Sequence, residues 1–288
     1  MKKKILITGA NGQLGRCLQA AISDYPELEG HFMGREHLPI NDFLLVDKVI
    51  DALKPDVILN TAAYTAVDKA ETEIETARSI NGYAVGNLAA AAKRNGASFV
   101  HISTDYVFDG QATMPYTENH PTDPLNAYGA SKLLGEELAV QAYSDSIIIR
   151  TSWVYSGYGN NFVKTMCRLM GSRENIGVVS DQWGCPTLAE DLANVLLEIS
   201  GSPVKGSGIF HYCNFGAINW YQFARAIQEL KGFSCKVNAI ATTDYPTPAK
   251  RPAYSVLSCN RLKEVWGIGQ RPWLDALMEA LPHIGENS

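Results

Sequence analysis

The sequence predicts an α/β fold, in which a doubly wound parallel sheet is followed by a smaller α/β lobe. Two observations lead to this prediction. Short, continuously apolar runs alternate with longer helical patterns through the first half, and a glycine-rich turn directly follows the first run. Continuous apolar runs are typical of strands buried on both faces, and parallel strands of this kind are joined by right-handed helical crossovers.

Four apolar runs supply the expected strands of the sheet. They are KILIT (4–8), DVILN (56–60), SFVHIS (98–103) and SIIIRT (146–151). The spacing of apolar positions predicts helices over 13–23, 42–53, 73–94 and 128–143. Asn41 is the expected N-cap of the second helix, because a short polar side chain can accept from the free backbone N–H groups of the first turn.

The second half is less regular and predicts the smaller lobe. We expect short strands in NIGVVS, GIFHYCN and KVNAIA, and helices over 162–171, 188–199, 219–231 and 272–282. The segment GSPVKGSG (201–208) is typical of a surface loop. The chain is therefore divided into residues 1–150, which form the main sheet, and residues 151–288, which form mainly the lobe, with later segments returning to the sheet.

Composition excludes several classes of function. The 288 residues are 46% hydrophobic, enough for a well-buried core, and the net charge of -5 provides no basic field to attract nucleic acid. No apolar run approaches the roughly 20 residues that span a bilayer, and the first strand follows the N-terminus too closely for a signal peptide. We therefore expect a cytoplasmic location. The six cysteines lack metal-ligand spacing, so we expect reduced thiols and no metal site built from them.

The glycine-rich turn indicates a dinucleotide site. ILITGANGQLG places Gly9, Gly12 and Gly15 between the first strand and the first helix. Gly9 permits the tight turn, Gly12 lets a pyrophosphate approach the backbone, and Gly15 lets the helix pack closely, while the helix N-terminus stabilises the anion. We therefore expect residues 1–150 to form an NAD(P)-binding Rossmann domain; a glycine-rich turn without a ligand is the alternative.

The residues after the second strand bear on the choice of dinucleotide. Where an NAD-specific site holds an acid about 20 residues after the glycines, HFMGREH offers Arg35, which suits the 2′-phosphate of NADPH. NADH is the alternative cofactor, because Glu36 is adjacent and Arg35 could equally be a solvated surface residue. In NDF (41–43), we expect Phe43 to lie against the edge of the adenine or, alternatively, in the core.

Tyr128 and Lys132 indicate a reaction centre, since residues four apart on a helix share one face. A free phenol ionises well above neutral pH, but an adjacent ammonium stabilises the phenolate and lowers that pKa. Tyr128 could then act as general acid to a carbonyl that is being reduced. Lys132 could also donate to ribose hydroxyls and so fix a nicotinamide beside the substrate.

The motif STDYVFDG (103–110) adds two polar groups to this centre. The strand before it delivers Thr104 to the carboxyl edge of the sheet, where ligands of such folds bind. The Thr104 hydroxyl can hydrogen-bond the carbonyl oxygen that Tyr128 protonates. Asp105 would accept from sugar hydroxyls or brace the loop. A YxxxK pair alone is common by chance, and its combination with the glycine loop and Thr104 makes the prediction specific.

Seven motifs resemble those of the extended short-chain dehydrogenase/reductase superfamily and, more narrowly, the dTDP-4-dehydrorhamnose reductase family. They are TGANGQLG, NTAAYTAVDKAE, STDYVFDG, YGASK, RTSWVY, DQWGCPT and RPAYSVL, and they cover nearly the whole chain. The resemblance implies reduction of the 4-keto group of dTDP-4-dehydro-L-rhamnose to dTDP-L-rhamnose by NADPH or NADH. It also implies that Thr104, Tyr128 and Lys132 are the catalytic triad.

The same resemblance implies further binding residues. On the cofactor side these are Asn11, Gln13, Leu14, Asp42, Phe43, Ala62, Ala63 and Tyr64. On the nucleotide-sugar side they are Trp153, Asn161, Gln182 and Arg251, with Arg251 a partner for the diphosphate. Large aromatic side chains usually pack in the core, so a core position is the alternative for Trp153.

A metal and a dimer interface are left open. Some members of the family that the chain resembles bind Mg²⁺ at a dimer interface through acidic residues, one of them early in the first helix, where this chain has Cys17. Glu190 and Asp191 lie together on a later helix, but paired acids on a solvated helix face are ordinary. Both a monomer and a homodimer are therefore compatible with the sequence.

Related functions share parts of this chemistry or fold. A sugar-nucleotide 4,6-dehydratase typically needs an Asp-Glu pair after the threonine, whereas Asp105 is followed by Tyr106 here. A 4-epimerase or another nucleotide-sugar reductase would share the hydride transfer. A non-catalytic NADP-binding subunit, resembling the regulatory subunit of methionine adenosyltransferase, would share the fold. The intact set of Thr104, Tyr128 and Lys132 favours a reductase that turns over.

Overall fold

The computed structural model describes residues 2–204 and 206–284. At its centre is a six-stranded parallel sheet in the order β10-β5-β4-β3-β1-β2. The strands are β1 (Lys3–Thr8), β2 (Leu28–Met33), β3 (Val57–Asn60), β4 (Ser98–Thr104), β5 (Ile147–Thr151) and β10 (Gly208–His211). The four apolar runs of the first half are β1, β3, β4 and β5, which confirms the predicted parallel sheet.

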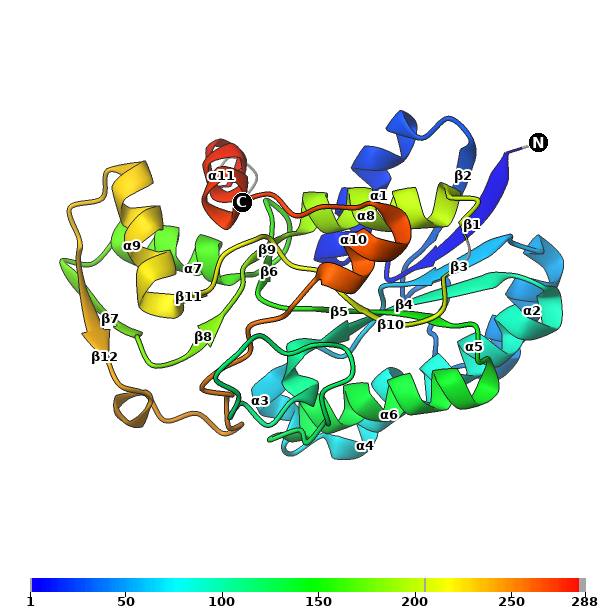
Figure 1. The fold of residues 1–288 in the computed structure, drawn as a ribbon, viewed down its shortest axis with the longest axis horizontal. Helices are drawn as coiled ribbons and strands as arrows, with labels where there is room; N and C mark the ends of the chain where they lie inside the picture. The colour runs from blue at the N-terminus through cyan, green and yellow to red at the C-terminus, as the bar shows by residue number, and fades with distance from the viewer. Residues whose placement is uncertain (1, 205, 285–288) are drawn as a thin grey trace.

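Helices cover both faces of the sheet (Figure 1). One face carries α1 (Gln13–Ala21), α8 (Ala189–Gly201) and α10 (Asn260–Trp266); the other carries α2 (Phe43–Leu53), α3 (Val67–Ala70), α4 (Ile74–Arg78), α5 (Ala84–Asn95) and α6 (Ala127–Ala142). Strand β1 shows why both faces must be covered: Ile5 and Ile7 enter the core beneath α1 and α8, whereas Leu6 enters the opposite core. Side chains alternate along a strand, so an uninterrupted apolar run requires apolar cover on both sides.

The smaller lobe has its own core and lies at one end of the sheet (Figure 1). Its helices are α7 (Phe162–Met170), α9 (Trp220–Lys231) and α11 (Trp273–Ala280). Three strand pairs complete it: β7 (Asn175–Val179) with β12 (Lys236–Ile240), β6 (Val154–Tyr155) with β9 (Thr187–Leu188), and β8 (Trp183–Gly184) with β11 (Ile218–Asn219). Three later elements, α8, β10 and α10, pack with the main sheet rather than with the lobe. The division of the chain into two domains near residue 150 stays a prediction.

Short helical turns connect these elements. They are η1 (Ile22–Asp24), η2 (Ser79–Tyr83), η3 (Asp105–Val107), η4 (Thr242–Asp244) and η5 (Leu281–His283). The predicted surface loop 201–208 contains Lys205, which lies outside the described residues. In the described part of the chain, no helix has the length and apolar character needed to cross a membrane.

One local prediction is wrong, and one predicted helix is confirmed with an irregular turn inside it. The N-cap of α2 is Asp42 rather than Asn41, because Asp42 directly precedes the helix and its carboxylate accepts from the Leu45 backbone N–H at 3.1 Å. The helix expected over 73–94 is interrupted by a π-helical turn, η2, between α4 and α5. This turn presses the Asn81 carbonyl against α6, where a Cβ at Gly135 would lie 2.0 Å from the Asn81 oxygen.

Candidate active site

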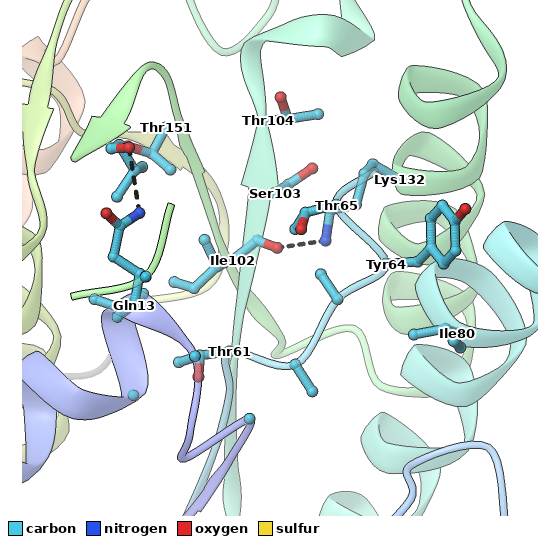
Figure 2. Close-up of a pocket in the computed structure, with 18 of the residues that line it drawn as sticks. Gln13, Thr61, Tyr64, Thr65, Ile80, Ile102, Ser103, Thr104, Lys132 and Thr151 are labelled. Carbon is cyan, nitrogen blue, oxygen red and sulfur yellow. Dashed lines mark hydrogen bonds between the residues drawn. The ribbon is translucent and has the colours of Figure 1, made fainter. Parts of the chain in front are cut away.

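A cavity of about 760 Å³ opens at the carboxyl edge of the sheet. It is lined by the loop after β1, the segment after β2, the ends of β3, β4 and β5, and the N-terminal half of α6. Figure 2 shows side chains from these elements converging on it. Of the residues predicted from sequence, the lining includes Gly9, Asn11, Gly12, Gln13, Leu14, Gly15, Arg35, Ala62, Ala63, Tyr64, Thr104, Asp105, Tyr128, Lys132 and Trp153.

The glycine loop has the geometry of a phosphate cradle. Gly9 has a positive φ of 68°, and a Cβ there would lie 2.6 Å from the Ala62 nitrogen. A Cβ at Gly15 would lie 2.4 Å from the Gly9 carbonyl, so this glycine lets α1 approach the loop. Gly12 caps α1 without a side-chain hydrogen bond, which leaves the N–H groups of the first turn available to an anion.

The segment after β2 forms the far end of the cavity. Arg35 and Glu36 both line it, and Asn11 Nδ2 donates to Glu36 Oε1 at 2.8 Å. Asp42 and Phe43 are not among the lining residues: Asp42 caps α2, and Phe43 is 41% exposed at the start of that helix. Their predicted contacts with the adenine therefore stay predictions.

Helix α6 and strand β4 place the predicted triad on one wall. Lys132 is 2% exposed, and its Nζ donates to the Ile102 carbonyl at 2.6 Å (Figure 2). The same nitrogen lies 3.1 Å from His101 Nε2. Thr104 Oγ1 donates to Asp105 Oδ1 at 3.0 Å and accepts from the Tyr106 N–H at 3.2 Å. The sheet edge thus presents a hydroxyl, a phenol and an amine to the same space.

The pKa values of this wall are governed by burial. Burial raises the pKa of Tyr128 to about 12; a hydrogen bond with Thr104 opposes the shift, and the charge of Asp105 adds to it. Burial lowers the pKa of Lys132 to about 7, and Glu136 opposes that shift. We expected the Lys132 ammonium to lower the pKa of the Tyr128 phenol, but burial is the larger effect and raises it. Tyr128 is held protonated at neutral pH, as a proton donor must be before it acts.

Asp105 is buried next to this centre. Burial raises the pKa of its carboxyl to about 6, whereas hydrogen bonds with Ser255 and Thr104 oppose the shift. In the described residues, Asp105 Oδ2 has no hydrogen-bond partner. The carboxyl accepts from the Thr104 hydroxyl and also lines the cavity, so binding of sugar hydroxyls and bracing of the loop both stay predictions.

Sequence reasoning missed a buried ion pair behind Lys132. Arg150 on β5 contacts Glu136 on α6 through Nη2–Oε2 at 2.7 Å and Nε–Oε1 at 3.0 Å, and Ser103 also donates to Glu136. The two charged side chains are 2% and 3% exposed. Arg150 is the one charged residue in the run SIIIRT, and a charge inside a fully buried strand was the signal that could have identified it.

Trp153 lines the cavity next to the smaller lobe. Its backbone has a positive φ of 50°, and its ring stacks on Trp220 with centroids 3.4 Å apart. A left-handed conformation is costly for a bulky residue and is found mostly at functional sites. The side chain thus packs against Trp220 of the lobe and also lines the cavity, and its predicted contact with the substrate stays a prediction.

Three predicted substrate contacts lie outside the cavity lining. Asn161 caps α7 and donates to Gln13 Oε1 at 2.8 Å. Gln182 donates to Thr242 Oγ1 at 3.0 Å. Arg251 forms a two-pronged pair with Asp68 on α3, with Nη2–Oδ2 at 2.9 Å. Substrate binding by Asn161, Gln182 and Arg251 stays a prediction.

The acidic residues considered for Mg²⁺ are already engaged. Arg271 binds both carboxylate oxygens of Asp191 at 2.7 Å, and Asn214 Nδ2 donates to it at 2.6 Å. Burial raises the pKa of Glu190, and Cys17 is a buried thiol. Among residues 2–204 and 206–284, no group of three His, Cys, Asp or Glu side chains could hold a metal. These residues do not fit a magnesium site, and no catalytic step is assigned to one.

Comparisons with known proteins agree with this geometry. The family model described as the RmlD substrate binding domain matches residues 2–285. A dTDP-4-dehydrorhamnose reductase of Aggregatibacter actinomycetemcomitans is 44% identical over 284 residues, which cover 95% of this chain and 97% of that protein.

Two solved structures are similar over nearly their full length. A dTDP-4-dehydrorhamnose reductase from Clostridium acetobutylicum has a TM-score of 0.93 at 44% identity, covering 97% of this chain and 98% of that one. The enzyme of the same name from Bacillus anthracis, solved in complex with NADP, has a TM-score of 0.92 at 38% identity, covering 98% and 99%. The chain therefore belongs to the dTDP-4-dehydrorhamnose reductase family, with the RmlD substrate binding domain as its signature.

Proposed function

We propose that this protein reduces the 4-keto group of dTDP-4-dehydro-L-rhamnose to give dTDP-L-rhamnose, with NADPH as the preferred hydride donor and NADH as the alternative. One observation carries the proposal. Thr104, Tyr128 and Lys132, which are separate in the sequence, line the same cavity as the glycine loop. Family membership makes the nucleotide-sugar ketone the expected substrate.

The residues present fit a dinucleotide. Side chains are excluded at Gly9 and Gly15, where a Cβ would collide with backbone atoms, so the loop offers bare backbone to a diphosphate. Arg35, at the far end of the cavity, is the residue proposed to bind the 2′-phosphate. Ala62, Ala63 and Tyr64 would border the cofactor at the end of β3. A reduced nicotinamide bound in this cavity supplies the hydride for the carbonyl carbon.

The chain's own residues handle the proton and the orientation of the ketone. Tyr128, protonated at neutral pH, donates its proton to the carbonyl oxygen as negative charge develops there. The Thr104 hydroxyl donates a second hydrogen bond to the same oxygen when it turns from Asp105. Lys132 in its charged form stabilises the phenolate left on Tyr128 and donates to the ribose.

On the substrate side, Trp153 is proposed to pack against the nucleotide sugar at the cavity wall. The Arg251 guanidinium is proposed to bind the diphosphate, which must then share it with Asp68 or replace that carboxylate. Asn161 and Gln182 are proposed to support this side of the site. Cytoplasmic location and a monomeric or homodimeric state are carried forward as predictions from the sequence.

The test is NADPH consumption, followed by loss of absorbance, with the 4-keto sugar nucleotide generated in situ. Tyr128→Phe keeps the ring and removes the acid, so kcat should fall by about 10²- to 10⁴-fold while NADPH still binds. Tyr83→Phe, a change at a tyrosine that is 48% exposed, is the matched control and should leave kcat unchanged. Near-wild-type turnover by Tyr128→Phe would remove Tyr128 from the mechanism. Cofactor binding without any NADPH loss in the wild type would instead favour a binding subunit.

A further inference from the structure

A chain of buried hydrogen bonds runs beneath the cavity and ends on Lys132. Thr8 Oγ1 on β1 donates to Asn60 Oδ1 on β3 at 2.6 Å. Asn60 Nδ2 lies 2.9 Å from His101 Nδ1 on β4, and His101 Nε2 lies 3.1 Å from Lys132 Nζ on α6. All four side chains are at most 2% exposed. Each bond matters for stability and charge, because a buried polar network has no water to replace a lost partner.

The orientation of Asn60 fixes the tautomer of His101. Asn60 Oδ1 also accepts from the Ala62 backbone N–H at 3.3 Å, and a backbone N–H can only donate. The amide oxygen must therefore face Thr8 and Ala62, and the amide NH₂ must face His101. Nδ1 of the ring then accepts, so the neutral imidazole carries its proton on Nε2.

His101 is neutral at physiological pH. Burial is the largest cause and lowers the pKa of the ring well below its usual range; a Lys132 ammonium would lower it further, and the Asn60 backbone opposes the shift. The ring stacks on Phe99 with centroids 6.2 Å apart, which holds its plane in place. The Nε2–H group therefore points as a fixed donor at the nitrogen of Lys132.

A donor facing this nitrogen favours the uncharged amine. Lys132 Nζ already donates to the Ile102 carbonyl, so a neutral amine can give that bond and accept from His101, whereas an ammonium has no lone pair to accept with. A charged Lys132 would face His101 donor to donor. Deprotonation relieves that repulsion.

The other ionisable groups around Lys132 do not cancel this effect. From α6, Glu136 favours the charged form, but its oxygens are bound by Arg150 of β5 and Ser103 of β4. Tyr128 on the same helix is protonated at neutral pH. Asp105 on η3 is turned toward Thr104. His101 is the ionisable group in direct hydrogen-bond contact with Lys132 in the described part of the chain.

We propose that His101 is a positioning residue of the reaction centre, which Asn60 holds in the tautomer that donates to Lys132. Lys132 is then uncharged in the free enzyme and takes up a proton when a dinucleotide binds. This inference rests on the proposed function, because the anionic cofactor supplies the charge that favours the ammonium. The ammonium then turns from His101 toward the ribose and the phenol. Binding of cofactor thereby switches Lys132 into its active form.

The tautomer is measured directly by ¹⁵N NMR of the histidine ring nitrogens in the full-length wild-type protein. His101→Gln identifies the His101 signals by their loss. Protonated Nε2 and unprotonated Nδ1 are expected at pH 8. A proton on Nδ1 would overturn the proposal, and this measurement does not depend on activity.

Proton uptake is measured by titrating NADP⁺ into the protein at pH 8 in two buffers of different ionisation enthalpy. The 2′-phosphate is fully ionised at this pH, so it contributes little. The wild type should take up between about half a proton and one proton for each NADP⁺ bound. In His101→Gln, burial still disfavours the ammonium, but the amide oxygen can accept from it, so a larger share of Lys132 should be charged before NADP⁺ binds and uptake should fall at least threefold.

A second variant tests whether Asn60 fixes the tautomer of His101. Asn60→Asp is isosteric, and its carboxylate accepts from Nδ1–H, which turns the Nε2 lone pair toward Lys132 and should also abolish uptake. His211→Gln is the matched control, because His211 is equally buried but its ring packs on Phe108; uptake should remain as in the wild type. Wild-type uptake in either folded test variant, or none in the wild type, overturns the proposal. Failure of the reductase proposal appears separately, as NADP⁺ binding without turnover of the 4-keto sugar.

Discussion

The buried pair of Arg150 and Glu136 should make a large contribution to the stability of the main sheet. The pair joins β5 to α6, and Ser103 attaches it to β4, with both charged side chains at most 3% exposed. Removal of one partner leaves the other charge without compensation inside the protein. That situation costs about 3–5 kcal/mol, against a total stability of about 5–15 kcal/mol for a typical protein.

The experiment compares Arg150→Met with the wild type in urea and thermal unfolding followed by circular dichroism. A loss of about 4 kcal/mol corresponds to a fall in Tm of roughly 10 °C for a chain of this size. The double variant Arg150→Met/Glu136→Met should regain much of that loss, because well-packed apolar residues often replace a buried ion pair without penalty. The difference between the double variant and the sum of the single variants gives the coupling.

The matched control is Arg225→Met, which breaks the pair that Arg225 makes with Glu229 on the surface of α9 at 2.9 Å. An exposed pair one helical turn apart contributes little, so this variant should be indistinguishable from the wild type. If Arg150→Met is no less stable than the control variant, the burial argument for the Arg150–Glu136 pair is wrong.

Four further outcomes are expected. Arg35→Ala should raise KM for NADPH by about tenfold and leave KM for NADH unchanged, and equal effects would reject the 2′-phosphate role. Burial raises the Asp105 pKa from 3.8 to about 6, so this carboxyl contributes stability below about pH 4 that is lost as the pH rises through 6. The free energy of unfolding of Asp105→Asn, measured in urea, should therefore rise relative to that of the wild type between pH 4 and pH 8, by at most roughly 3 kcal/mol. A difference between the two proteins that does not change with pH would contradict the raised pKa of Asp105. Gly184→Ala places a Cβ 2.6 Å from the Trp153 ring, so it should raise KM for the sugar nucleotide with little change in NADPH affinity by fluorescence titration. Prolonged treatment with EDTA should leave kcat unchanged, because Arg271 already neutralises Asp191.

The sheet was predictable because its signals are local. Each of β1, β3, β4 and β5 is a mostly apolar run, and the glycine loop follows β1 at the one place where a diphosphate site needs it. The error at the α2 cap has the same origin. Asn41 and Asp42 are both good caps, and only the backbone position of the first helical residue decides between them.

The partners of buried charges were not predictable, because they are set by tertiary packing. Lys132 meets His101, which is 31 residues away in the sequence, and Arg251 meets Asp68 across 183 residues. No spacing rule connects such pairs. Resemblance to the reductase family implied that Arg251 binds the diphosphate, which stays a prediction, and it did not indicate that the Asp68 carboxylate already pairs with Arg251.

Gln13 shows how a residue identified for one role can serve another. It was expected to contact the cofactor, and it lines the cavity, but its amide also joins the glycine loop to the lobe. Nε2 donates to the Val154 carbonyl at 3.3 Å, and Oε1 accepts from Ser156 at 3.1 Å and from Asn161 at 2.8 Å. Asn161 is therefore linked to the cavity by its hydrogen bond to Gln13, which lines it. Because this one amide bonds both the glycine loop and the segment that carries Trp153, we expect that any shift of the glycine loop on dinucleotide binding would also move that segment.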